Sequence, residues 1–81
     1  MNTIIDITPY INITNGVQLT TDKKKEYRLC ITGSEIGTDL PYHVTITTIS
    51  EIPERIVYDF YMDKCHSISL DDEIITFKVN D

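Results

Sequence analysis

Residues 42–50, "YHVTITTIS", decide the fold class, because apolar and polar side chains alternate along them. Val44 and Ile46 fall on one side of an extended chain, and His43 and Thr45 fall on the other. A period of two residues is the pattern of a β-strand with one face buried and one face in water. Threonine is common on such exposed faces, so a half-exposed sheet explains the polar side better than a binding surface does.

The alternation breaks at Thr47-Thr48, just before Ile49. Counted strictly, Ile49 lies on the opposite face from Ile46. If one of the two threonines is an extra residue, a β-bulge returns Ile49 to the buried face. A bulge at this point is therefore the expectation that keeps Ile49 in the core.

Composition extends the β prediction to the whole chain. The 81 residues include no Ala and no Trp but many Ile and Thr. Ala is the best helix former, whereas β-branched side chains favour strands. The segment "GSEIGTDLP" carries two glycines and a proline, which predicts a loop. Further alternating runs lie at residues 3–8, 10–20, 26–33, 55–63 and 67–79.

The dipeptide Asn15-Gly16 is the sharpest local signal. It separates two alternating runs and favours a type I′ turn, in which both central residues need a positive φ. The isoleucines before the turn should then pack against Val17 and Leu19 after it.

These runs predict two packed sheets of short strands. No segment has the length and period of the helix that oligonucleotide-binding barrels usually carry. We expect one domain over residues 1–81, an all-β fold: a small antiparallel β-sandwich of immunoglobulin-like type with about seven short strands, or alternatively a small β-barrel. Alternation places each of these groups on one shared face: Ile5 with Ile7, Ile11 and Ile13 with Val17 and Leu19, Tyr27 with Leu29 and Ile31, and Val44 with Ile46. The residues expected to point into the core are Ile49, Ile56, Tyr58, Phe60, Met62, Ile75, Phe77 and Val79.

The charge balance restricts the partners. With Lys+Arg 7 against Asp+Glu 13, the net charge of −6 opposes binding to phosphate backbones and anionic lipids. We therefore expect no direct contact with nucleic acid or membranes. The start "MNTIIDITPY" shows no secretory signal, which favours a cytoplasmic protein.

Patterns for catalysis and metal binding are missing from the sequence. Cys30, Cys65, His43 and His66 match no metal-binding spacing, and no glycine-rich phosphate loop is present. Cys65 and His66 are adjacent, which makes them a poor nucleophile and base pair within a strand. We expect no enzymatic activity and no cofactor. The cysteines should be free thiols in a reducing cytosol, and a disulfide between them stays open for an exported protein.

Two acidic segments are the candidate partner-binding surfaces. Asp59, Tyr61 and Asp63 share the outer face of residues 55–63, where an exposed aromatic between two acids suits a basic protein partner. The alternative is that the acids only keep a sheet edge soluble. The second segment is Asp71, Asp72 and Glu73, in which the first two residues are expected to form a turn. If both segments lie at the same end of the sandwich, they form one acidic patch.

The sequence thus favours a small, acidic, non-enzymatic protein that inhibits its target by occupying a basic surface. An Ala-free, Ile-rich chain suits a gene of low GC content, as in phage-encoded antagonists of host or defence proteins, and immunity proteins against basic toxins fit equally. The alternatives are a structural module of a larger particle, with homo-oligomers left open, and a carbohydrate-binding domain that uses Tyr10, Tyr42 and Tyr61.

Overall fold

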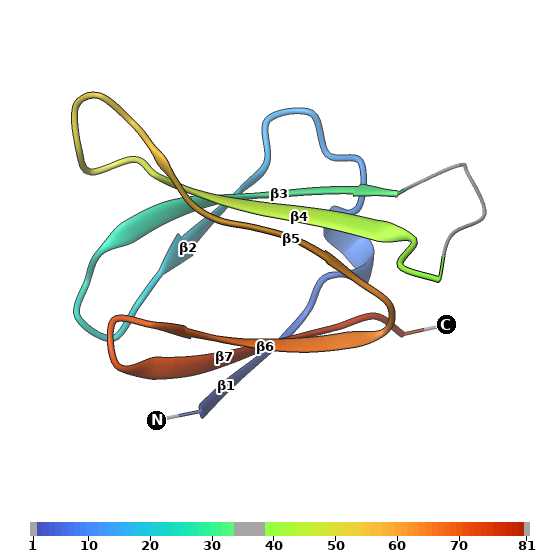
Figure 1. Ribbon diagram of the computed structural model, residues 1–81. Coiled ribbons are helices and arrows are strands. Elements are labelled where there is room, and N and C mark those ends of the chain that lie inside the picture. Colours follow the sequence, from blue (N-terminus) through green and yellow to red (C-terminus); the bar gives the residue numbers. More distant parts are fainter. Residues whose placement is uncertain (1, 34–38, 81) are drawn as a thin grey trace.

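The computed structural model describes residues 2–33 and 39–80 and has seven strands and a one-turn 3-10 helix in that part of the chain (Figure 1). The predicted all-β class is confirmed. The loop predicted at residues 33–41 lies mostly outside the described residues. The elements are β1 (Asn2–Asp6), η1 (Thr8–Tyr10), β2 (Val17–Thr20), β3 (Glu26–Gly33), β4 (Tyr42–Thr48), β5 (Ile56–Met62), β6 (Cys65–Leu70) and β7 (Glu73–Lys78).

The strands form two sheets that face each other. One has the order β1-β7-β6 and the other the order β2-β3-β4-β5. Neighbours from β2 to β5, and β6 with β7, pair antiparallel, whereas β1 pairs parallel to β7. Within each sheet, neighbouring strands are consecutive in the sequence except for β1 and β7, which differs from the Greek-key order of immunoglobulin domains. The immunoglobulin-like comparison extends to the two packed layers only.

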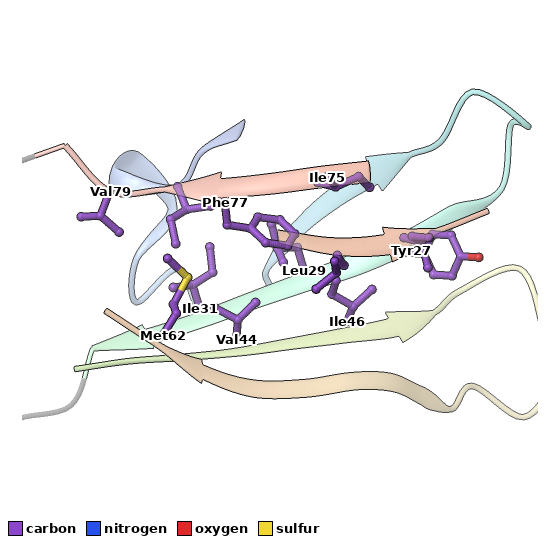
Figure 2. Packing of buried hydrophobic residues seen from close by; sticks show 12 residues of the cluster. Tyr27, Leu29, Ile31, Val44, Ile46, Met62, Ile75, Phe77 and Val79 are labelled. Atoms are coloured by element: carbon purple, nitrogen blue, oxygen red, sulfur yellow. The ribbon is translucent and has the colours of Figure 1, made fainter. Parts of the chain in front are cut away.

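The core lies between the two sheets (Figure 2). Phe77, on the central strand of the smaller sheet, is 0% exposed. Tyr58 and Phe60 are only partly buried, because β5 is an edge strand of the larger sheet. The buried hydrophobic residues are Ile7, Tyr27, Leu29, Ile31, Val44, Ile46, Met62, Ile68, Leu70, Ile75, Phe77 and Val79.

The hairpin predicted at Asn15-Gly16 is wrong. Gly16 has a φ of 71°, but Asn15 is not among the residues with positive φ, so the type I′ turn is not formed. Residues 10–14 are not a strand. Instead, the backbone N–H of Gly16 bonds to the carbonyl of Ile13, and Ile11 forms a parallel bridge with Ile31 of β3. Contact with β3 thus outweighs the local turn preference.

The irregularity predicted at Thr47-Thr48 belongs to the partner strand. The register between β4 and β5 shifts between Ile46 and Thr47, because Ile46 pairs with Tyr58 and Thr47 pairs with Ile56. The unmatched residue is Val57 of β5, which supplies the bulge.

Two predicted orientations therefore change. Ile56 was expected in the core, but the bulge turns it outward and leaves it 60% exposed. The alternation of β4 instead continues through Thr48, which is 4% exposed, and Ile49 stays half-buried. Thr48 is accommodated because its hydroxyl accepts a hydrogen bond from the backbone N–H of Arg55 at 3.1 Å.

Candidate interaction surfaces

The outer face of β4 and β5 holds an ordered group of three side chains: His43, Asp59 and Tyr61. The rings of His43 and Tyr61 stack with centroids 4.3 Å apart and planes 9° apart, because the two residues are register partners. His43 Nε2 hydrogen-bonds to Asp59 Oδ1 at 2.5 Å. Tyr61 nevertheless remains 55% exposed. The face therefore presents an aromatic ring and a carboxylate whose positions are fixed by a third side chain.

Asp63 lies in the two-residue connection from β5 to β6. It is exposed. Asp59 and Tyr61 thus lie at alternate positions on the edge strand β5, as the sequence indicated, whereas Asp63 directly follows the strand's last residue, Met62. The sequence did not assign His43 to this surface, although its outward orientation was expected. Its pairing depends on the register between β4 and β5, which no local pattern states.

Asp71 and Asp72 form the turn between β6 and β7, as predicted. Both have positive φ values, 52° and 64°, which is the geometry of a type I′ turn. The type I′ turn that the sequence indicated at Asn15-Gly16 is therefore formed at Asp71-Asp72 instead, where neither residue is a glycine. The short polar side chain of Asp tolerates the left-handed region better than most residues.

The side chain of Asp71 holds the two sheets together. It accepts hydrogen bonds from the Tyr27 hydroxyl at 2.9 Å and the Thr21 hydroxyl at 3.1 Å, and Lys25 Nζ lies 3.4 Å from its other oxygen. Burial raises the pKa of Asp71, but these hydrogen bonds and the charge of Lys25 outweigh it, so the pKa lies below its ordinary value. Asp71 is 10% exposed at its side chain and is a structural group.

Glu73 is also a structural group. It is 5% exposed, and it accepts hydrogen bonds from the Thr3 hydroxyl and from the backbone N–H of Asp22 at 3.0 Å. Both hydrogen bonds lower the pKa of Glu73, and the bond from Thr3 has the larger effect. The carboxylate joins β7 to β1 and to the turn after β2. We had expected Glu73 on the binding surface, but the sequence pattern of β7 places it inward with Ile75 and Phe77.

Asp72 is the exposed member of the second segment. Its carboxylate lies 2.5 Å from Lys23 Nζ, and the pair leaves the Asp72 side chain 85% exposed. The Lys23 side chain hydrogen-bonds to the carboxylate, which lowers the pKa of Asp72 and raises that of Lys23. Lys23 and Lys25, in the connection from β2 to β3, thus offset the charge of Asp72 and Asp71.

The two acidic segments do not form one patch. Asp63 precedes β6 and Asp71 follows it, so the segments lie at opposite ends of that strand (Figure 1). The candidate surface at the other end consists of the exposed residues Asp59, Tyr61 and Asp63 together with the half-buried His43. We call it the β5 surface.

Other candidate chemistry is less organised. Tyr42 packs against the core whereas Tyr61 faces outward, so they do not form the platform that a sugar ring needs. Cys30 and Cys65 are free thiols. In residues 2–33 and 39–80, no three His, Cys, Asp or Glu side chains gather as a metal site requires, and no pocket is found.

No helix in the described part of the chain is long and apolar enough to span a membrane. No family model matches the chain, and no curated protein or solved structure shows significant similarity to it.

Proposed function

We propose that this chain is a small, cytoplasmic, non-enzymatic protein that binds a basic surface of another protein through its β5 surface and thereby inhibits it. Phage-encoded antagonists and immunity proteins against basic toxins are the two settings that suit such a protein. The observation that carries the proposal is the exposed Tyr61 ring, stacked on His43 beside Asp59.

Pre-ordering supports this role for Tyr61. A tyrosine buries a large area and loses little side-chain entropy on binding, and here the stacking has already fixed the ring. Aromatic anchors of this kind often dominate the binding free energy of protein interfaces.

The charge distribution supports a basic partner. Lys23 and Lys25 pair with the acidic turn, and Arg28 and Arg55 pair with Glu54 and Glu51. Four of the seven Lys and Arg side chains thus pair with acids other than Asp59 and Asp63, on a chain with a net charge of −6. Such a surface repels acidic proteins and increases the association rate with basic ones.

The test is affinity capture from a lysate of the source organism, with wild type beside the triple variant Asp59→Ala, Tyr61→Ala and Asp63→Ala. We expect one basic protein to be retained at low salt and released as the salt concentration rises, because ions screen exposed charges beyond about 3 Å at 1 M salt. The triple variant should bind the identified protein at least about tenfold more weakly.

The matched control is Asp22→Ala, Asp39→Ala and Tyr10→Ala, which removes the same two charges and one exposed tyrosine from other places. It should bind like wild type. If the folded triple variant binds as tightly as wild type, or if both variants weaken binding equally, the β5 surface is not the binding site.

A further inference from the structure

The outer face of the β1-β7-β6 sheet carries two exposed isoleucines, Ile4 on the edge strand β1 and Ile74 on the central strand β7. Ile4 is 72% exposed and Ile74 is 49% exposed. Ile4 is the register partner of Thr76, which in turn pairs with Ser67. The middle row across the three strands is therefore Ile4, Thr76 and Ser67, and it carries no charge.

The two outer rows complete this face. One row is Asn2, Ile74 and Ser69, again without charge. The other row holds Asp6 and Lys78, which are side by side and opposite in sign. The two charges of this face therefore lie in one row and cancel, and the other two rows carry none. The outer face of the larger sheet differs, since Glu26, Arg28 and Asp59 all lie on it.

From this arrangement we infer that the β1-β7-β6 face packs against the same face of a second copy of this chain. A two-fold axis that crosses the strands through the middle row places Ile4 against Ile4 of the second copy. The same operation places Asp6 against Asn2 and Lys78 against Ile74, whose apolar surface can cover the lysine stem. No like charges oppose each other, so the face is complementary to itself.

Charge also decides between a second copy and another partner. Two copies with a net charge of −6 repel each other wherever their acidic groups approach. The face without an excess of acids is the one where that repulsion is least, and it lies on the opposite layer from the β5 surface. Depletion of charge at the centre is also the compositional mark of protein interfaces.

The size of the face predicts a weak dimer. Three strands about 4.8 Å apart, each contributing about five residues of 3.4 Å, give a contact well below the roughly 800 Å² per partner of standard interfaces. We therefore expect dimers only at high protein concentration. Added salt should strengthen the dimer by screening the net charge, whereas it should weaken capture of a basic partner.

Sedimentation equilibrium tests the inference on the full chain, from about 10 µM to 1 mM protein, which covers weak interfaces. We expect a monomer–dimer equilibrium that Ile4→Lys and Ile4→Glu each weaken at least tenfold. An equal mixture of the two variants should recover association, because position 4 faces itself across the axis. Ile13→Lys, at a position that is 46% exposed before β2, should associate like wild type.

A substitution at Ser67 distinguishes two ways of forming a dimer: packing of the β1-β7-β6 faces and pairing of two β1 edge strands. Ser67 lies on β6, with β7 between it and β1. Ser67→Lys should therefore weaken association in face packing and leave edge pairing unchanged. A monomer throughout the concentration range, a dimer indifferent to Ile4→Lys, or a dimer indifferent to Ser67→Lys would each overturn the inference.

Discussion

The Tyr27 hydroxyl donates a hydrogen bond to Asp71 Oδ2 at 2.9 Å, and this bond links β3 of the larger sheet to the β6–β7 turn of the smaller one. The Tyr27 ring closes one end of the core (Figure 2), so one residue contributes both apolar area and a contact between layers. Thr21 and Lys25 complete the shell around the same carboxylate. Local turn structure and packing of the sheets are thus coupled at this end of the sandwich.

Tyr27→Phe should destabilise the fold by about 1–2 kcal/mol, because it keeps the ring and removes one hydrogen bond to a carboxylate. Asp71 retains Thr21 and Lys25, which limits the loss. Urea unfolding at pH 7 measures the difference, with Tyr10→Phe, at an exposed position, as the control. Equal stability of Tyr27→Phe and wild type would contradict a role for this bond.

The same residue predicts a loss of stability in alkali. Burial and the hydrogen bond to Asp71 raise the pKa of Tyr27 to about 12, from an ordinary value of 10.0. The folded state therefore holds the phenol proton more tightly than the unfolded state. Its contribution is complete below pH 10 and is lost as the pH rises toward 12. The stability gap between wild type and Tyr27→Phe should narrow from pH 8 to pH 11 in urea unfolding; a constant gap would contradict this assignment.

At Glu73 we expect the opposite pH dependence: its contribution to folding stability is lost in acid. Hydrogen bonds from Thr3 and then from the Asp22 backbone lower its pKa below 4.5, so the folded state binds the proton less readily than the unfolded state. The resulting stability is present above pH 4.5 and is lost as the pH falls through the folded-state pKa. Glu73→Gln should be less stable than wild type at pH 7, and the difference should shrink as the pH falls through the folded-state pKa of Glu73. Asp39→Asn, at an exposed carboxylate, is the control for the removal of one negative charge.

The sequence predicted the strands well because their alternation is local. Tyr27, Leu29 and Ile31 face inward as expected, and so do Ile75 and Phe77. Each of these strands keeps its period of two residues without interruption. Patterns of this kind do not depend on which strand lies alongside.

The errors arose where a neighbouring strand decides the outcome. The alternation predicts Ile56 in the core. The bulge at Val57, which depends on the pairing of β5 with β4, instead turns Ile56 outward. Asn15-Gly16 reads as a hairpin, but the bridge from Ile11 to Ile31 sets the course of that segment.

In the candidate site, the sequence could predict only those features that depend on the alternation within a single strand. Asp59 and Tyr61 were expected to face outward, which requires only the period of β5. The stacking of His43 on Tyr61 requires the register of β4 against β5, and the anchoring of Asp71 requires contact between turns about fifty positions apart. Such contacts are set by tertiary structure.

Phe77 and Phe60 provide the last prediction, because their rings lie 5.9 Å apart between centroids but differ in burial. Phe77 is 0% exposed, whereas Phe60 is partly exposed and stacks on His66 with centroids 4.3 Å apart. Phe77→Ala should cost about 3–5 kcal/mol of unfolding free energy. Phe60→Ala should cost about 2 kcal/mol, because part of its ring stays in water in the folded state.

Urea unfolding of both variants measures these costs, and Phe77→Leu and Phe60→Leu replace them if the Ala variants do not fold. Leu keeps apolar volume, so both losses shrink while their order is preserved. A larger loss at Phe60 than at Phe77 would mean that the edge strand β5, rather than the central strand β7, supplies the main apolar contact between the layers.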